Sequence, residues 1–249
     1  MAHINDSPEF IILDETPSTN TELKNRLTSH QLQEFSIVIT EHQTAGRGQQ
    51  GNSWESKKGA NLTFSVLLRP SFLEPHLQFY LSKIVSLAIV DVLHTHHIEA
   101  SIKWPNDIYI NDEKVAGILI ESSLTGSQMD STVVGIGLNV NQCVFVSDAP
   151  NPISLTQITG LKYDLESLLK QLLNAIITRY HQLQECNFED IDKLYFQKLY
   201  RNTGAYSYKD QNGSFIATLH KVNADGILTL LDQDGRKRQY AFKEVEFII

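Results

Sequence analysis

A glycine-rich stretch, residues 41–54 (EHQTAGRGQQGNSW), contains the residues of this chain best suited to hold an anion. Gly46, Gly48 and Gly51 surround a single cation, Arg47, and Trp54 closes the run. Glycine adopts positive φ without a Cβ clash, so its backbone N–H groups can come close to a phosphate. The guanidinium of Arg47 adds a planar, permanently charged donor for phosphate or carboxylate oxygens. This combination predicts an anion-binding loop.

The same stretch also has a purely structural interpretation, as a long hairpin loop whose glycines only relieve strain. Residues 36–40 before it are rich in β-branched side chains, as strands are, and residues 61–68 after it read as another strand. The stretch is not a P-loop, because no Gly-Lys-Ser or Gly-Lys-Thr follows, and it does not open a helix as the dinucleotide fingerprint does. The surrounding motifs must decide between the two interpretations.

Three short polar side chains, Ser18, Thr19 and Asn20, stand where a helix is expected to begin. Thr19 and Glu22 have the spacing of a capping box, so a helix over about residues 19–28 is the structural explanation of this cluster. A helix N-terminus that presents three such side chains is also a hydrogen-bonding site for a ligand. The two roles are compatible.

A predicted hairpin, residues 101–121, carries two lysines and a displayed polar pair. Pro105 removes a backbone donor and forces its predecessor to be extended, so a bulge or strand break is expected there. Asn106 and Asp107 follow directly and are expected to be displayed rather than paired away. Lys103 and Lys114 stand at opposite ends of the hairpin and come close together if the register allows.

Residues 132–141 (TVVGIGLNVN) predict another strand, with Gly135 and Gly137 two positions apart. Glycines inside a strand weaken it and often mark the close approach of a ligand or of another backbone. Asn139 falls on the same face as both glycines by the two-residue period of a strand, so it could hydrogen-bond whatever approaches. The alternative is a barrel-like bend without a ligand.

Length and composition bound the remaining choices. A chain of 249 residues predicts one large domain, alone or with a small module, and its net charge of −8 argues against general nucleic-acid binding. Cys143 and Cys186 have no metal-type spacing and are expected to be free, buried thiols of a reducing compartment. No signal peptide is evident, and the apolar helix candidate at 77–98 contains Lys83 and Asp91, which disfavours a membrane span. A cytoplasmic protein is expected.

The pattern of elements changes near residue 202. Before it, helices are expected over about 76–97, from residue 164 onward and over 188–200, where apolar residues recur at helical spacing. After it, turn signals recur about every ten residues, at 210–213, 223–226 and 232–235, which suggests a small all-β barrel. The predicted domains are therefore residues 1–201 and residues 202–249.

Taken together, the motifs resemble those of biotin–protein ligases, also called biotin–[acetyl-CoA-carboxylase] ligases. The matching segments occur in family order: Ser18-Thr19-Asn20, Gln43, Gly46-Arg47-Gly48-x-x-Gly51-x-x-Trp54, residues 103–107 (KWPND), residues 114–121 (KVAGILIE) and residues 135–141 (GIGLNVN). The resemblance covers nearly the whole chain. It implies an α+β fold, with a mixed sheet flanked by helices like that of class II synthetases, followed by an SH3-like β-barrel.

The resemblance also implies a two-step reaction. The biotin carboxylate attacks the α-phosphate of ATP, giving biotinyl-5′-adenylate and pyrophosphate, and a lysine of a biotin carboxyl carrier domain then takes the biotinyl group. Cationic groups must offset the repulsion between two anions in the first step. Mg²⁺ is expected on the ATP phosphates and no protein metal site is expected. The glycine loop would close over the reactive adenylate as a lid.

The family's site residues carry over to matching positions of this chain. The catalytic group is expected to be Arg47, Lys114 and Asp107, with Asp107 orienting or deprotonating the incoming lysine. The biotin site is expected to comprise Ser18, Thr19, Asn20, Gln43, Arg47, Gly48, Gln49 and Lys114. The nucleotide site is expected to comprise Gly46, Gly51, Trp54, Lys103, Asn106 and Asn139, with Trp54 against adenine.

Two departures from the family pattern affect the expected function. Many relatives carry arginines where this chain has Gln49, Gln50 and Asn52, so weaker electrostatic retention of the adenylate is expected. The Ser-Thr-Asn cluster lies within the first twenty residues, which leaves no room before it for the winged helix of bifunctional ligase–repressors. We therefore expect a monofunctional ligase that binds biotin, ATP and a carrier domain but neither operator DNA nor membrane; a homodimer is left open.

Two other functions remain open at this stage. A lipoate–protein ligase shares the fold and the adenylation step, but needs no polar pocket for a ureido ring. A module that binds a carrier domain or a ligand without turnover is the third alternative. Retention of Arg47, Lys114 and Asp107 argues against it, since an inactive relative should have lost at least one of them.

Overall fold

The computed structural model describes residues 7–147 and 150–249 of the chain. Its centre is a seven-stranded mixed sheet in the order β1-β2-β3-β7-β6-β5-β4, in which only β1 and β2 run parallel. Its strands are β1 (Phe10–Thr16), β2 (Ile37–Gln43), β3 (Leu62–Leu68), β4 (Ser101–Lys103), β5 (Asp107–Ile110), β6 (Glu113–Thr125) and β7 (Gln128–Leu138).

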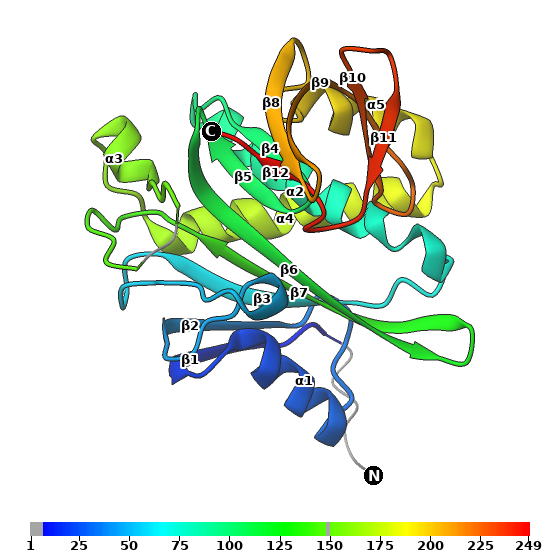
Figure 1. Ribbon diagram of the computed structural model, residues 1–249. Helices are drawn as coiled ribbons and strands as arrows, with labels where there is room; N and C mark the ends of the chain where they lie inside the picture. Colours follow the sequence, from blue (N-terminus) through cyan, green and yellow to red (C-terminus); the bar gives the residue numbers. More distant parts are fainter. Residues whose placement is uncertain (1–6, 148–149) are drawn as a thin grey trace.

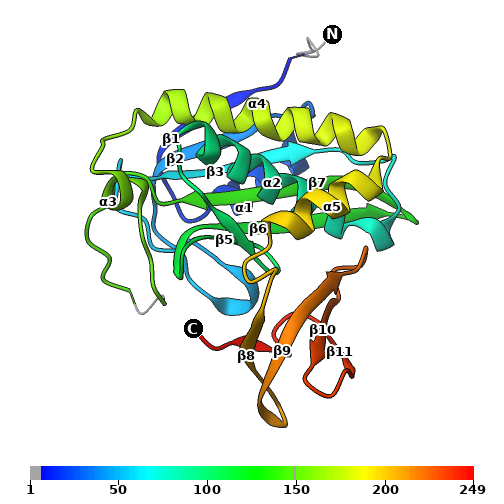
Figure 2. The same cartoon turned by 90° about the horizontal axis from the view of Figure 1, so that it is seen from above.

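Helices cover both faces of this sheet, which confirms the predicted α+β fold. Helix α1 (Thr19–Ser29) packs beneath β1, β2 and β3 in Figure 1 and buries Leu23 in a small apolar cluster. On the other face, α2 (Phe79–Thr95), α4 (Leu165–Gln184) and α5 (Phe188–Lys198) gather together, as Figure 2 shows. The main apolar core lies between these helices and the sheet.

Helix α2 is the central helix of that core. Residues Pro75–Thr95, which contain α2 and the turn before it, are long and apolar enough, by length and composition, to cross a membrane, but 72% of the relevant 18-residue window is buried inside the fold. Lys83 within α2 is fully buried, with its ammonium 2.6 Å from Asp192 Oδ1 and 4.4 Å from the centre of the Tyr80 ring. Burial lowers the pKa of Lys83, and the ion pair with Asp192 opposes that shift. The internal lysine is therefore accommodated by a partner on α5 and by aromatic neighbours.

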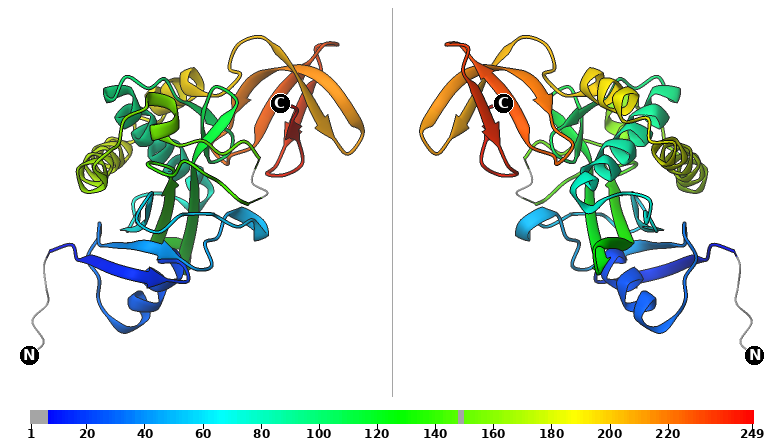
Figure 3. Two further views of the ribbon diagram at one scale, coloured as in Figure 1. Left: turned by 90° about the vertical axis from the view of Figure 1, so that its left-hand side faces the viewer. Right: turned by 90° about the vertical axis from the view of Figure 1, so that its right-hand side faces the viewer.

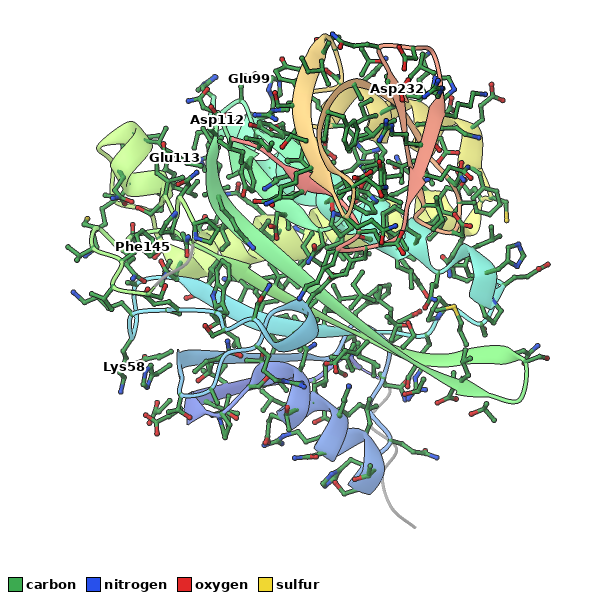
Figure 4. All side chains as sticks on the ribbon, in the orientation of Figure 1. Lys58, Glu99, Asp112, Glu113, Phe145 and Asp232 are labelled. Carbon is green, nitrogen blue, oxygen red and sulfur yellow. The ribbon has the colours of Figure 1, made fainter. Side chains whose placement is uncertain are left out.

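Short elements depart from the sequence-based expectations. A 3₁₀ turn, η2 (Pro75–Leu77), precedes α2, so the predicted helix from residue 76 begins later. Helix α3 (Leu155–Thr159) was not predicted, because five residues are too few for a periodic pattern. Its start does carry a capping box of Ser154 and Gln157. The predicted strand break at 104–106 is confirmed. Asp112 and Glu113, labelled in Figure 4, lie where the turn after β5 leads into β6.

The C-terminal part forms a second sheet, five-stranded and antiparallel, in the order β11-β10-β9-β8-β12. Its strands are β8 (Ala205–Asp210), β9 (Gly213–Val222), β10 (Leu228–Asp232), β11 (Lys237–Tyr240) and β12 (Glu246–Phe247). The three predicted turns between the strands are confirmed. Closure into an SH3-like barrel is not confirmed, because the described outer strands β11 and β12 do not pair with each other.

The second sheet packs against the rest of the molecule at the end opposite α1, as both views in Figure 3 show. Trp104 at the β4–β5 break donates from Nε1 to the Gly226 carbonyl, 2.9 Å away. Phe79 lies against the same glycine, where a Cβ would approach its ring to 2.7 Å. Tyr200 and Phe247 add a ring contact with centroids 6.4 Å apart. Aromatic side chains thus hold the C-terminal strands close to β4 and β5.

Both cysteines are free, as predicted, but the expectation that they are buried is wrong. Cys143 lies after β7 and Cys186 follows α4, and both are exposed. Neither position belongs to the periodic apolar pattern of a strand or helix, so the general tendency of cysteine to be buried has no local support there.

Candidate active site

A cavity of about 660 Å³ lies over the middle of the main sheet and contains most of the predicted site residues. In Figure 2 the light-blue glycine loop and the red C-terminal segment lie on the same side of the molecule, and both line this cavity. The predicted residues that line it are Ser18, Thr19, Asn20, Gln43, Arg47, Gly48, Gln49, Trp54, Lys103, Asn106, Asp107 and Lys114. Three predicted residues lie outside the lining: Gly46, Gly51 and Asn139.

Asn20 is the centre of the polar wall at one end of the cavity. Its side chain is 3% exposed; Oδ1 accepts from Ser65 Oγ at 2.6 Å and Nδ2 donates to the Leu119 carbonyl at 3.2 Å. A Cβ on Gly135 would lie 2.2 Å from Asn20 Oδ1, so only glycine leaves space for this side chain. The strand glycine thus marks a close approach, as one of the two interpretations predicted, and the approaching group is Asn20.

The capping box predicted from Thr19 and Glu22 is wrong. The N-cap of α1 is Ser18, and its side chain makes no capping hydrogen bond. Thr19 is directed instead to the neighbouring strand, since its backbone N–H and its hydroxyl both donate to Gln43 Oε1, at 2.9 and 3.2 Å. Tertiary partners on β2 and β3 therefore replaced the local capping pattern, and the polar cluster faces the cavity.

The glycine loop folds back on itself as a small hairpin. Gly48 N–H donates to the Asn52 carbonyl at 2.6 Å, and Trp54 N–H donates to the Gly46 carbonyl at 2.9 Å, with a 3₁₀ turn, η1 (Gln49–Gly51), at the tip. Gly51 has a φ of +87°, which favours glycine. A Cβ on Gly46 would lie 2.4 Å from the Trp54 carbonyl oxygen. Gly46 and Gly51 therefore shape the loop rather than line the cavity.

Trp54 lies flat against the two glycines where β6 and β7 pair. A Cβ on Gly137 would lie 2.3 Å from its ring, and a Cβ on Gly117 would lie 3.2 Å from it. The buried Trp54 Nε1 and the buried Asn139 Oδ1 have no hydrogen-bond partner among the described residues. Buried polar atoms without partners are rare in folded proteins and suit a site that is completed by a ligand.

The cations Lys103 and Lys114 lie at the other side of the cavity. Lys114 Nζ is 2.6 Å from Asp107 Oδ1 and 5.8 Å from the centre of the Trp54 ring. Lys103 Nζ donates to the Tyr109 hydroxyl at 3.0 Å. Burial lowers the pKa of Lys103, with repulsion from Lys114 adding to the effect and attraction by Asp107 opposing it. The two lysines thus lie close enough to act on one anionic ligand.

The expectation that Asn106 is displayed is wrong. Its side chain is 9% exposed and its Nδ2 donates to the Ile118 carbonyl, while its own carbonyl accepts from Ile118 N–H. Asn106 therefore anchors the β4–β5 break to β6. Asp107 is held by Lys114 rather than freely displayed.

Three further site features were missed from the sequence. Ser65 on β3 and Tyr109 on β5 support Asn20 and Lys103, and a C-terminal segment closes the cavity from the second sheet. That segment contributes Phe242, Lys243, Val245, Glu246, Phe247 and Ile249. Ser65 and Tyr109 look like ordinary strand residues, and no sequence signal brings residues 242–249 to this place.

The profile of the Biotin/lipoate A/B protein ligase family matches residues 12–139, which is more than half of the chain. The chain belongs to this family. A bifunctional ligase/repressor, BirA, of Bacillus spizizenii is 30% identical over 241 residues, covering 94% of this chain and 73% of the relative. A biotin–[acetyl-CoA-carboxylase] ligase of Paracoccus denitrificans is 32% identical over 200 residues, covering 76% of this chain and 80% of the relative.

A solved structure extends the family likeness across the fold. Biotin protein ligase from Aquifex aeolicus, in complex with biotin and ATP, superposes with a TM-score of 0.79 at 27% identity, covering 96% of this chain and 97% of that one. The matched length includes the C-terminal strands. The family resemblance drawn from the motifs is therefore confirmed.

Proposed function

We propose that this member of the biotin/lipoate ligase family is an ATP-dependent biotin–protein ligase that acts through biotinyl-5′-adenylate. The observation that carries the proposal is one cavity that joins a polar wall, at Asn20 and Gln43, to the cations Arg47, Lys103 and Lys114. A polar wall suits the ureido ring of biotin, which offers both donors and acceptors. Three cations suit the meeting of a carboxylate with a triphosphate.

The first step needs two anions to come together. A carboxylate oxygen of biotin forms a bond to the α-phosphorus of ATP while the bond from that phosphorus to the pyrophosphate oxygen breaks. Arg47 is proposed to hold the carboxylate, and Lys114 and Lys103 to offset charge on the α-phosphate. Because these cations are in place before the substrates arrive, little reorganisation is needed in the transition state.

Mg²⁺ is proposed to arrive with ATP as part of the substrate. Among residues 7–147 and 150–249, no group of three or more His, Cys, Asp or Glu side chains is placed to hold a metal ion. Oxygen ligands for Mg²⁺ would come mainly from the phosphates. His94 and His96, which cluster in the sequence, are bound instead to Glu99 and Gln171.

The nucleotide base is proposed to lie beside Trp54, which lines the cavity. Asn139 lies outside the lining and its partnerless Oδ1 is buried, so it is proposed to support the base site from behind the lining. Stacking of a base on an aromatic ring is sequence-tolerant and contributes about 1–3 kcal/mol. Gly46 and Gly51 contribute indirectly, by shaping the loop that carries Trp54. This proposal retains the role expected for Trp54 from the sequence, which is to lie against adenine.

The second step transfers the biotinyl group to a carrier lysine. The neutral amine attacks the acyl carbon, AMP leaves, and the amine proton must be removed. Asp107 is proposed to orient that amine or take its proton, because it lines the cavity and its Oδ1 lies 2.6 Å from Lys114 Nζ. The partner is proposed to be a biotin carboxyl carrier domain, in the cytoplasm, with neither nucleic acid nor membrane involved.

The division into residues 1–201 and 202–249 and the SH3-like nature of the second unit also remain proposals. The change from helices to a separate antiparallel sheet after α5 supports them. The alignment over 96% of the chain with the Aquifex aeolicus ligase is consistent with both.

The experiment that tests the function is direct. The protein is incubated with ATP, Mg²⁺ and an acceptor carrier domain, with either biotin or lipoate, and pyrophosphate release and acceptor mass are measured. We expect both signals with biotin and neither with lipoate. Lys114→Ala is expected to remain folded and to lose adenylate formation. Turnover with lipoate alone would favour the lipoate ligase, and unchanged activity of Lys114→Ala would refute the site.

A further inference from the structure

The carboxylate of Glu121 on β6 is the meeting point of three side chains, two from helix α1 and one from the glycine loop. Lys24 Nζ lies 2.5 Å from its Oε1, while Asn20 Nδ2 and Arg47 Nη2 lie 2.7 and 3.3 Å from its Oε2. The Glu121 side chain is 23% exposed. One acidic group on β6 therefore joins helix α1, whose Asn20 belongs to the polar wall, to the glycine loop, and neither the motif roles nor the proposed chemistry uses it.

Arg47 connects the tip of the glycine loop to the rest of the fold. Its Nη2 donates to Glu121 and, at 3.1 Å, to the hydroxyl of Thr21 on α1. These two hydrogen bonds join the loop tip, residues 47–52, to residues outside the loop. The side chain of Arg47 thus hydrogen-bonds the loop tip to the body of the protein.

The charges around Glu121 favour a persistent contact. Burial raises the pKa of the Glu121 carboxyl, but hydrogen bonds from Lys24 and Asn20 more than offset this and lower it. Glu121 is consequently ionised at neutral pH and faces two cations, Lys24 and Arg47. The cluster retains one excess positive charge, so it need not repel an anionic substrate.

The guanidinium of Arg47 can hold Glu121 and a ligand at once. Within the described part of the chain, only Nη2 takes part in its hydrogen bonds, and guanidinium carries five N–H donors. Arg47 also lines the cavity. The donors not used by Glu121 and Thr21 thus remain for a carboxylate or phosphate.

We propose that Glu121 is a positioning residue of the ligase, whose carboxylate holds Arg47 and thereby keeps the glycine loop folded over the biotin end of the cavity. The proposal rests on the proposed function, because it assigns Arg47 to the same substrate. Glu121 does not touch the substrate itself. It acts through Arg47 on loop closure, and through Asn20 on the wall that the loop covers.

Trypsin cleavage at the Arg47–Gly48 bond tests the contact in the ligand-free protein. Trypsin must engage Arg47 itself, so pairing with Glu121 should protect the bond, and cleavage should follow the population of the open loop. Glu121→Gln removes the charge and keeps the side-chain volume. We expect about fivefold faster cleavage, the upper end of what an exposed ion pair contributes. Lys24→Gln, which removes the other cation from the same carboxylate, is the matched control and should change cleavage less than twofold.

Thr21→Val provides a second variant that leaves Glu121 and Lys24 intact. It removes the other hydrogen bond from Arg47 and should speed cleavage by roughly twofold to threefold, in line with the small net contribution of one exposed hydrogen bond. If Glu121→Gln does not fold, this variant decides. Cleavage at the wild-type rate in the folded variants would overturn the proposal.

Ligation kinetics test the consequence for function. Glu121→Gln should raise the KM for biotin and the dissociation rate of the adenylate about fivefold each, while kcat falls less than twofold. Lys24→Gln should leave all three unchanged. If no adenylate forms in any variant, the proposed function fails but the cleavage result still judges the contact. If adenylate forms and Glu121→Gln binds biotin and adenylate as the wild type does, the positioning role is refuted.

Discussion

Gly137 gives a direct test of how the nucleotide end of the cavity is built. It lies in β7 beside Trp54, with no positive φ that would itself disfavour a side chain. An alanine Cβ at this position would lie 2.3 Å from Trp54 Cε2 and 2.5 Å from Trp54 Nε1. The three atoms nearest to the added Cβ all belong to the indole ring, so Gly137→Ala acts on the cavity through Trp54.

The size of the displacement follows from the contact distance. Ordinary contact begins at 3.4 Å, so the ring must move by about 1.1 Å (3.4 − 2.3) to admit the methyl group. Loss of a base–aromatic stack costs about 1–3 kcal/mol, which corresponds to roughly a 5- to 150-fold increase in the KM for ATP. The affinity for biotin should change far less, because Asn20 lies against Gly135 and not against Gly137.

Two glycines of the same strand pair serve as matched controls. Gly117→Ala would place its Cβ 3.2 Å from the Trp54 ring, so a shift of about 0.2 Å (3.4 − 3.2) suffices and the KM for ATP should rise less than threefold. Gly135→Ala would place its Cβ 2.2 Å from Asn20 Oδ1 and should weaken biotin binding instead. The three variants thus separate the two ends of one cavity.

The assay is pyrophosphate exchange at varied ATP with saturating biotin, together with calorimetric biotin binding without ATP. Thermal unfolding of each variant checks that the fold is intact. An ATP KM within twofold of wild type for a folded Gly137→Ala variant would refute the placement of the base beside Trp54. An equal loss of biotin binding in Gly137→Ala and Gly135→Ala would refute the division of the cavity.

Three further predictions concern single side chains. Gln49→Arg adds a cation to the loop and should slow adenylate dissociation roughly fivefold in a chase experiment; no slowing would contradict the weak retention expected from Gln49. Asp107→Asn should reduce transfer to the carrier by about 100-fold but pyrophosphate exchange much less, and equal losses would exclude a role specific to transfer. Burial, together with its hydrogen bond to Asp112, raises the pKa of Tyr200 to about 12. Since the unfolded chain loses this proton nearer pH 10, the free energy of unfolding should fall as pH rises from 10 to 12. In urea unfolding the free energy of Tyr200→Phe should fall less steeply than that of the wild type, with a difference in slope of at most about 1.4 kcal/mol per pH unit. Parallel curves for the two proteins would refute this.

Most of the fold could be predicted because the signals are local. Apolar residues at helical spacing identified α2, α4 and α5 to within a few residues, and Pro105 correctly marked the break between β4 and β5. The failures were also local. Thr19 and Glu22 have the capping-box spacing, yet Thr19 bonds to Gln43, because a partner on a neighbouring strand competed with the helix end.

The candidate site also combines properties that local sequence specifies with contacts that it does not. The sequence by itself determined which residues could do chemistry, since glycine conformational freedom, the charge of Arg47 and the lysines, and the polar Ser-Thr-Asn cluster are properties of residue type. Only the tertiary structure decided that Gly137 makes room for Trp54, that Glu121 holds Arg47, and that residues 242–249 close the cavity. Those contacts join positions far apart in the chain, and they depend on strand register and on the packing of the second sheet, which no local pattern specifies.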